Sequence, residues 1–229
     1  MNKNIFKNKK VLITGHTGFK GSWLSIWMHH LGAKVHGISN EVPTTPANYD
    51  IFKRIFSSEK RIDVRNYNDL KSFIDNLRPD FIFHLAAQPI VIESYSNPLN
   101  TFTTNTIGVA NVLESLRTIN YPCSTVIITS DKCYDNVEWL YGYREIDSLG
   151  GKDPYSGSKG AAELVIKSYY HSFFKESKSN VKVAVGRAGN VIGGGDWSPF
   201  RIVPDCIKSW VSNKEVEIRS PLSTRPWQH

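Results

Sequence analysis

Short apolar runs rich in β-branched residues alternate along the chain with longer stretches in which apolar residues recur at helical spacing. Several of the short runs are apolar on both faces, which is typical of parallel strands covered by helices on each side. They predict six strands, at Lys10–Thr14, Lys34–Ser39, Arg61–Val64, Phe81–Leu85, Thr125–Ser130 and Lys182–Arg187. The longer stretches predict helices at Ser22–Leu31, Asn68–Leu77, Leu99–Thr118, Ser156–Lys175 and Ile202–Ser212.

This alternation of strands and helices predicts an α/β fold with a doubly wound, Rossmann-type parallel sheet and right-handed crossovers. Asn68 or Asp69 is expected to cap the second helix, and Pro79 to follow it as a stop. Ligands of such sheets bind beyond the carboxyl ends of the strands. Functional residues are therefore expected directly after each predicted strand.

A glycine-rich turn follows the first predicted strand and runs directly into a helix. Gly15, Gly18 and Gly21 permit a tight turn, a close approach of the backbone to a pyrophosphate, and close packing of helix on strand. The helix N-terminus then presents free N–H groups and a positive dipole end to the phosphates. The turn predicts a dinucleotide site, and a glycine-rich turn without a ligand is the alternative.

The GxxGxxG spacing of this turn resembles the extended branch of the short-chain dehydrogenase/reductase superfamily. The resemblance implies that the dinucleotide lies against Gly15, His16, Thr17, Gly18, Phe19 and Gly21. Asp63 and Val64 resemble the pair that contacts adenine in this superfamily, and Leu85, Ala86 and Ala87 resemble its loop close to the cofactor.

The end of the second predicted strand bears on the choice of cofactor. The strand is followed by Asn40 and Glu41, near the point where many NAD-binding relatives carry an acidic residue for the ribose hydroxyls. No arginine stands close by in the sequence to hold a 2′-phosphate. NAD is therefore favoured over NADP.

Tyr155 and Lys159 stand four residues apart at the start of a predicted helix, so both project from one face. A phenol with a pKa of about 10 is a poor base at neutral pH, and a nearby ammonium group favours the phenolate. Ser130 ends the fifth predicted strand, where its hydroxyl can orient the tyrosine. A lone pair of this kind is often two surface side chains, but combined with the glycine turn and the serine it predicts an active site.

The residues around Ser130 resemble the motif of sugar-nucleotide 4,6-dehydratases, in which an aspartic acid follows the hydroxyl residue. Here Asp131 is followed by Lys132, where a glutamate is usual. This lysine, with the segments Gly15–Leu24, Arg187–Trp197 and Arg225–His229, resembles the CDP-glucose 4,6-dehydratases. In isolation, Asp131 and Lys132 would be interpreted as an exposed ion pair in a loop.

This resemblance implies an NAD-dependent lyase that forms CDP-4-keto-6-deoxyglucose, as in deoxysugar and O-antigen biosynthesis. The sugar is oxidised at C4, water leaves across C5 and C6, and a hydride returns to C6. The implied catalytic residues are Ser130, Asp131, Lys132, Tyr155 and Lys159. Lys132 either removes the C5 proton or stays charged and stabilises an enolate.

Substrate contacts are expected in the last part of the chain. Asn190 resembles the asparagine that contacts the substrate diphosphate, and Arg201 and Arg219 are candidates because a guanidinium binds phosphate bidentately. Trp197 is a further candidate in the same loop. The expected division is an NAD-binding domain over residues 1–186 and an incomplete substrate-binding region over 187–229. By resemblance, a homodimer is expected through the helices at 99–118 and 156–175.

The net charge and the cysteine content limit the kinds of ligand and site that the chain is expected to have. The 229 residues carry 28 Lys and Arg against 21 Asp and Glu, a net charge of +7 that fits nucleic acid, anionic membranes or phosphorylated ligands. A dinucleotide and a nucleotide sugar account for this charge without nucleic acid. Three scattered cysteines support neither a disulfide framework nor a metal site.

No apolar run is long enough to span a bilayer or to form a signal peptide, which predicts a cytoplasmic protein without membrane partners. Two other functions stay open: a sugar-nucleotide epimerase or reductase, and an inactive NAD-binding fragment.

Overall fold

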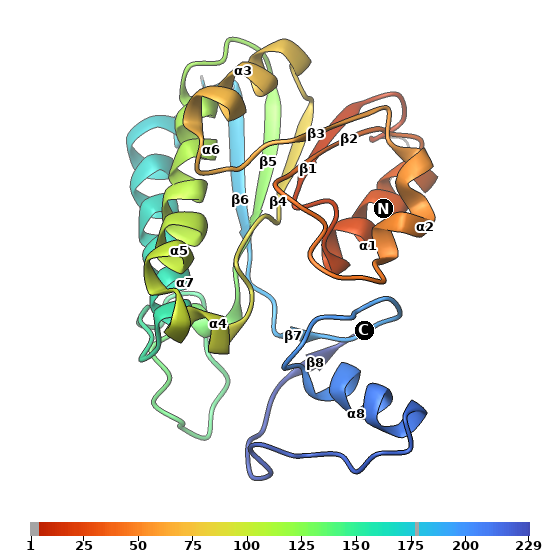
Figure 1. The fold of residues 1–229 in the computed structure, drawn as a ribbon. Helices are drawn as coiled ribbons and strands as arrows, with labels where there is room; N and C mark the ends of the chain where they lie inside the picture. Colours follow the sequence, from red (N-terminus) through yellow and green to blue (C-terminus); the bar gives the residue numbers. More distant parts are fainter. Residues whose placement is uncertain (1–4, 177–178) are drawn as a thin grey trace.

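The computed structural model describes residues 5–176 and 179–229. Its main sheet has six parallel strands in the order β3-β2-β1-β4-β5-β6 (Figure 1). Their bounds are Lys10–Thr14 (β1), Lys34–Ser39 (β2), Ser58–Arg61 (β3), Phe81–His84 (β4), Cys123–Ile128 (β5) and Val181–Gly186 (β6). The predicted doubly wound α/β fold is confirmed. The strand order reverses between β1 and β4, the point at which open α/β sheets bind ligands.

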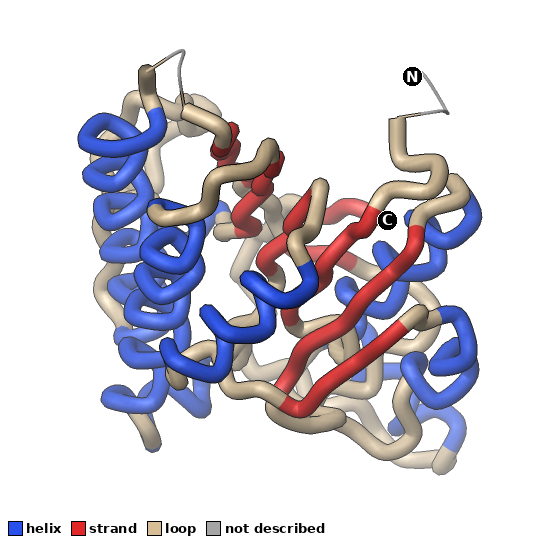
Figure 2. The backbone as a smooth tube through the Cα atoms, turned by 90° about the horizontal axis from the view of Figure 1, so that it is seen from above, coloured by secondary structure: helices blue, strands red, loops and turns tan. Residues whose placement is uncertain are grey.

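Helices cover both faces of this sheet (Figures 1 and 2). One face carries α1 (Phe19–His30) and the short α2 (Asn48–Phe52), and the other carries α3 (Tyr67–Leu77), α6 (Gly108–Arg117) and α7 (Pro154–Tyr169). Shorter elements complete this part of the chain: α4 (Val91–Ser96), α5 (Pro98–Phe102), the 3₁₀ turns η1 (Lys53–Ile55) and η3 (Asp131–Cys133), and the π-helical turns η2 (Thr103–Ile107) and η4 (Tyr170–Phe174).

The core follows from the alternation of side chains along β1. Leu12 points to the α3, α6 and α7 face and packs with residues such as Leu113 and Ile127. Val11 and Ile13 point to the opposite face and pack with Met28 of α1. Because both faces are covered, a continuous apolar run is the pattern that β1 requires.

Two details of the prediction are wrong. The third strand ends where it was expected to begin, at Arg61, because β3 is a polar edge strand, and the apolar residues that suggested a strand, Ile62 and Val64, are buried after it. The cap of α3 is Asn66 rather than Asn68 or Asp69, since its side chain accepts a hydrogen bond from the Asp69 backbone N–H at 3.3 Å.

The predicted helix at 99–118 is built from three consecutive elements, α5, η2 and α6. In the part of the chain that the structure describes, no helix has the length and apolar character needed to cross a membrane.

The last segment lies beside α1 (Figure 1). It consists of β7 (Asn190–Val191), α8 (Ile202–Val211) and β8 (Trp227–Gln228), which pairs with β7 in parallel. The Trp23 indole N–H of α1 donates to the Gly194 carbonyl at 2.8 Å, and the Phe19 ring lies against Gly193. The final segment is therefore attached to the same helix that follows the glycine turn.

Candidate active site

The glycine turn has the shape that a dinucleotide pyrophosphate requires. Gly15 has a φ of +71°, and a Cβ atom there would lie 2.8 Å from the Ala86 nitrogen. A Cβ atom on Gly21 would lie 2.1 Å from the Gly15 carbonyl oxygen. A Cβ atom on Gly18, the residue before α1, would have only one neighbouring atom, the Gly15 carbonyl oxygen, at 3.4 Å. The fold thus demands glycine at 15 and 21, while the space at Gly18 fits a phosphate close to the helix N-terminus.

Thr14 joins this turn to the loop after β4. Its hydroxyl lies 2.7 Å from His84 Nδ1 and accepts hydrogen bonds from the backbone N–H groups of Leu85 and Ala86, both at 3.1 Å. Burial, with a contribution from the charge of Lys159, lowers the pKa of His84 to about 3, so the ring is neutral. The predicted loop, Leu85 to Ala87, is therefore positioned by two residues that sequence analysis did not select.

His16 and Thr17 present little of their side chains to a ligand. The His16 ring is fully buried between Tyr49 and Phe56, with Nε2 3.1 Å from a Glu59 carboxylate oxygen, and burial lowers its pKa. The Thr17 hydroxyl donates to the Glu41 carbonyl at 2.6 Å. Both residues stay predicted cofactor contacts. Because their side chains are buried, we expect them to contact the cofactor through main-chain atoms.

Asp63 and Val64 follow β3 at the same edge of the sheet. Val64 is buried against Gly108, and Asp63 accepts hydrogen bonds from Arg65, which hold the pKa of the Asp63 carboxyl below its usual value. Their place beyond a strand end fits the predicted adenine contact.

Tyr155 and Lys159 lie together near the start of α7, as their spacing predicts. Asp153 caps the helix by accepting a hydrogen bond from the Ser156 N–H at 2.9 Å, and Pro154 occupies the first turn. Both side chains are buried, and Lys159 Nζ lies 6.0 Å from the centre of the Tyr155 ring.

The electrostatics of this pair come mainly from burial. Burial raises the pKa of Tyr155, while Ser130 and the charge of Arg201 act to lower it. Burial lowers the pKa of Lys159 to about 8, and the charge of Lys20 adds to this effect. The same cluster of charges acts on Lys20, because loss of hydration and the charges of Arg201 and Lys132 lower its pKa.

Ser130, Asp131 and Lys132 form a connected group directly after β5. The Ser130 hydroxyl donates to Asp131 Oδ1 at 2.9 Å, and the Lys132 ammonium lies 3.2 Å from the same oxygen. Lys132 also donates to Asn190 Oδ1 at 3.1 Å. The structure thus brings Asn190, predicted as a substrate contact, to the predicted catalytic lysine.

Glu163 joins α7, which carries the predicted catalytic residues Tyr155 and Lys159, to the sheet. It accepts a hydrogen bond from Thr129 at 2.5 Å and two from Arg187, at 2.9 and 3.0 Å. Arg187 also donates to the Tyr134 hydroxyl at 2.8 Å, and these contacts raise its pKa. Sequence analysis missed Glu163, although a glutamate one turn after Lys159 on a buried face was a usable signal.

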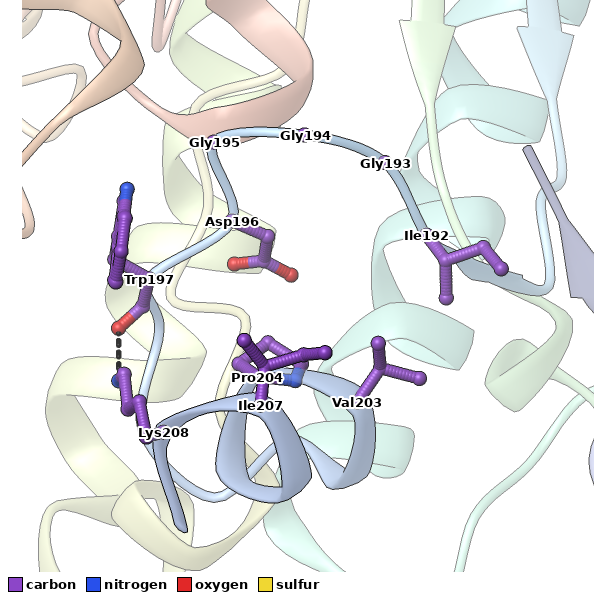
Figure 3. Close-up of a pocket in the computed structure, with 10 residues that line it drawn as sticks. All are labelled: Ile192, Gly193, Gly194, Gly195, Asp196, Trp197, Val203, Pro204, Ile207 and Lys208. Atoms are coloured by element: carbon purple, nitrogen blue, oxygen red, sulfur yellow. Dashed lines mark hydrogen bonds between the residues drawn. The ribbon is translucent and has the colours of Figure 1, made fainter. Parts of the chain in front are cut away.

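A cavity of about 190 Å³ lies between the loop after β7 and α8 (Figure 3). Gly193 to Gly195 and Trp197 line one side, and Val203, Pro204 and Ile207 line the other. The Trp197 carbonyl accepts a hydrogen bond from Lys208 at 2.8 Å. The loop that lines this cavity begins just after Asn190 in the chain. The predicted residue Trp197 is part of the lining.

The two predicted arginines are paired with carboxylates. Arg201 lies 2.8 Å from Asp196, and Arg219 lies 3.0 Å from Asp205 of α8. The charge of Arg201 contributes to lowering the pKa of both Tyr155 and Lys20. Within residues 5–176 and 179–229, no group of three or more His, Cys, Asp or Glu side chains is arranged to hold a metal ion.

The family model described as GDP-mannose 4,6 dehydratase matches residues 12–193. The chain belongs to this family. It is 46% identical over its whole length to the CDP-glucose 4,6-dehydratase of Salmonella typhimurium, and it spans 65% of that protein. It is 28% identical, over 93% of its length, to the CDP-paratose 2-epimerase of Salmonella typhi, of which it spans 66%.

A solved structure of dTDP-glucose 4,6-dehydratase from Bacillus anthracis, in complex with NAD, has the same fold. The TM-score is 0.79 at 24% identity, and the match covers 96% of this chain and 67% of that chain. Membership of the family confirms the resemblance drawn from the motifs. The chain spans about two thirds of the length of these relatives, and the division at residue 186 and the assigned site residues stay predictions.

Proposed function

We propose that this member of the family is a sugar-nucleotide 4,6-dehydratase that converts CDP-glucose to CDP-4-keto-6-deoxyglucose with NAD. The observation that carries the proposal is the hydrogen-bonded group of Ser130, Asp131 and Lys132, which lies beside the buried Tyr155 and Lys159. The identity of 46% to a CDP-glucose 4,6-dehydratase supports the choice of substrate.

NAD fits the glycine turn, where Gly18 leaves room beside the start of α1. When bound, it accepts a hydride from C4 of the sugar and returns a hydride to C6. The chain supplies the turn from Gly15 to Gly21, the Leu85–Ala87 loop, the Asp63–Val64 pair, and Tyr155 and Lys159 on the side of the nicotinamide.

Tyr155 is the base for the C4 hydroxyl in this proposal. Burial disfavours its phenolate, whereas the Lys159 ammonium at 6.0 Å from the ring centre favours it. The Ser130 hydroxyl donates to Asp131 in this structure, and by rotating it can donate to the Tyr155 phenolate instead, the direction in which Ser130 lowers the pKa of Tyr155. A neighbouring cation and an oriented hydroxyl are the features that a catalytic tyrosine needs.

Lys132 and Asp131 carry out the elimination as a proton-transfer pair. A proton shift along their 3.2 Å contact converts the ion pair into a neutral amine and a carboxylic acid. The amine then removes the C5 proton, which the C4 ketone has made acidic, and the acid protonates the C6 hydroxyl as it leaves. One proton is taken up and one is released, so the elimination ends with the original ion pair.

The charges around the cleft support an anionic substrate. The four cations Lys20, Lys132, Lys159 and Arg201 outnumber the three carboxylates that act on Lys20 and Lys159, those of Asp131, Asp196 and Glu163. This excess of positive charge suits a diphosphate. We assign the substrate side to Asn190, Trp197, Arg201 and Arg219, with the cavity beside Trp197 as the place for part of the nucleotide.

We also infer a cytoplasmic homodimer with a role in deoxysugar biosynthesis, including that of O-antigen. Exposed apolar side chains on α5, η2 and α7, namely Leu99, Phe102, Ile107 and Leu164, support a partner surface there. All three cysteines are free, and Cys123 and Cys133 are buried, as is usual in a reducing compartment.

The proposal is tested by supplying CDP-glucose and NAD and identifying the product. A dehydratase yields a 4-keto-6-deoxy sugar in which deuterium from C4 reappears at C6 of the same molecule. Lys132→Ala should still oxidise C4 but should lose both elimination and exchange of the C5 hydrogen with solvent, whereas the exposed Lys182→Ala serves as an unaffected control. A C4 epimer that keeps its C6 hydroxyl would instead establish an epimerase.

A further inference from the structure

A guanidinium group lies at the carboxyl end of β2, where the adenosine ribose of a dinucleotide binds. Arg61 is the last residue of β3, and the parallel pairing of β2 with β3 places it opposite Ser39, the last residue of β2. Arg61 Nη1 donates to the Ser39 hydroxyl at 3.0 Å. Its guanidinium carbon lies 5.5 Å from the centre of the Tyr49 ring, a cation–π contact that further orients the side chain.

The residue that follows β2 determines whether a Rossmann-type fold prefers a ribose with a free 2′-hydroxyl or one with a 2′-phosphate. An acidic side chain there accepts hydrogen bonds from the 2′-hydroxyl and repels a 2′-phosphate, whereas a nearby arginine accommodates the phosphate. Here β2 ends at Ser39 and is followed by Asn40, both uncharged. The first acid, Glu41, comes two residues after the strand.

The charge of Arg61 acts on Glu59, His16 and Tyr49, but it is held in no ion pair of the described residues. The nearest acid on its own strand, Glu59, is engaged by the Tyr49 hydroxyl at 2.6 Å and lies 3.1 Å from His16 Nε2. Arg61 is exposed, so its other N–H groups can reach a phosphate from solvent.

We propose that the adenosine end of the dinucleotide site binds a 2′-phosphate through Arg61, which Ser39 and Tyr49 hold in place, so that the protein accepts NADP as well as NAD. The inference rests on the dinucleotide site of the proposed function. A planar guanidinium held by Ser39 and Tyr49 can donate two parallel hydrogen bonds to phosphate oxygens, and such charge-assisted bonds are the strong ones.

The test uses two probes that differ only in the 2′-phosphate, adenosine 2′,5′-bisphosphate and 5′-AMP, with affinities measured by calorimetry. The protein should bind the bisphosphate at least about tenfold more tightly, which corresponds to one good charge-assisted contact. Arg61→Ala should abolish this preference and leave 5′-AMP binding in place. Arg61→Lys, which keeps the charge without the fork, should retain part of it.

Lys60→Ala is the matched control, because successive residues of a strand point to opposite faces and Lys60 is also exposed. It should leave the preference unchanged. Equal binding of the two probes by the unaltered protein, or a preference that survives Arg61→Ala, would overturn the inference.

The cofactors themselves separate this inference from the proposed function. Binding of NADP without dehydration of CDP-glucose would leave the inference standing and remove the proposed function. Dehydration with NAD together with no binding of NADP would do the opposite. If neither NAD nor 5′-AMP binds, the glycine turn is not a dinucleotide site and both fail.

Discussion

The sheet region and the final segment of this protein are held in place in different ways. The region up to Gly186 has two clusters of fully or nearly fully buried apolar side chains, one on each face of the sheet. From Lys182 to His229 no residue is buried, and α8 contributes none to either cluster. The first region therefore has a core of its own, whereas the second depends on contacts with the first.

Those contacts are few and mostly polar. The Asp131 N–H donates to the Ala188 carbonyl at 3.0 Å, Lys132 donates to Asn190, and Trp23 donates to Gly194. Each such hydrogen bond contributes on the order of 1 kcal/mol. The predicted acid–base groups thus sit on a rigid frame, and the predicted substrate groups sit on a weakly held segment, which is where ligand-binding parts usually lie.

The strongest test of this contrast concerns the ion pair that joins the two regions, between the buried Glu163 and the half-buried Arg187. Glu163→Ala leaves Arg187 without its partner and should lower the free energy of unfolding by about 3–5 kcal/mol. Urea denaturation measures the change. Glu114→Ala, which breaks the more exposed pair with Arg117, should cost less than about 1 kcal/mol. Equal losses would show that Glu163 is not a structural link.

Truncation of apolar side chains should affect the two regions very unequally. Leu113→Ala removes a fully buried side chain of α6 and should cost about 2–5 kcal/mol. Leu222→Ala removes a side chain that is 96% exposed and should change stability by less than about 0.5 kcal/mol. A large loss at Leu222, measured in the same urea titrations, would mean that the final segment has a core in solution.

Lys159 is buried in the sheet region, and its titration should make the free energy of unfolding depend on pH in the alkaline range. Its pKa falls from 10.5 to about 8 on folding, so between these values the unfolded chain holds a proton that the folded protein lacks. Lys159 should therefore make stability rise with pH from about 8 to 9, above which the buried thiols of Cys123 and Cys133, with pKa values raised from 9.0 to about 11 and about 12, act in the opposite direction. Lys159→Met should remove the rise and increase stability at neutral pH by about 1–3 kcal/mol. The exposed Lys167→Met should leave the rise in place, and thermal unfolding at several pH values tests both.

The smallest effect is expected at the attachment of the final segment. Trp23→Phe removes the N–H that donates to Gly194 and should cost about 1 kcal/mol, mainly in local opening of residues 190–200. Amide hydrogen exchange should become faster there and stay unchanged in α6. Trp210→Phe, on the exposed side of α8, is the control. Faster exchange throughout the sheet would indicate that the two regions unfold together.

Features with a local cause could be predicted from the sequence. The β1 strand and the glycine turn follow from an apolar run and from spacing that only glycine satisfies, at Gly15 and Gly21. The pairing of Tyr155 with Lys159 follows from helical periodicity. The third strand was misplaced because β3 lies at the sheet edge, where exposed polar residues carry no apolar signal.

The sequence by itself thus determined the fold class, the family, the turn at the start of α1 and the groups that follow each strand, because these depend on residues within one or two turns of each other. Only the tertiary structure decided which distant groups meet. Arg61 reaches Ser39 through strand pairing, Glu163 joins Arg187 across helix and sheet, and Lys132 meets Asn190 across 58 positions. Such contacts depend on register and packing over the whole sheet, which no local pattern encodes.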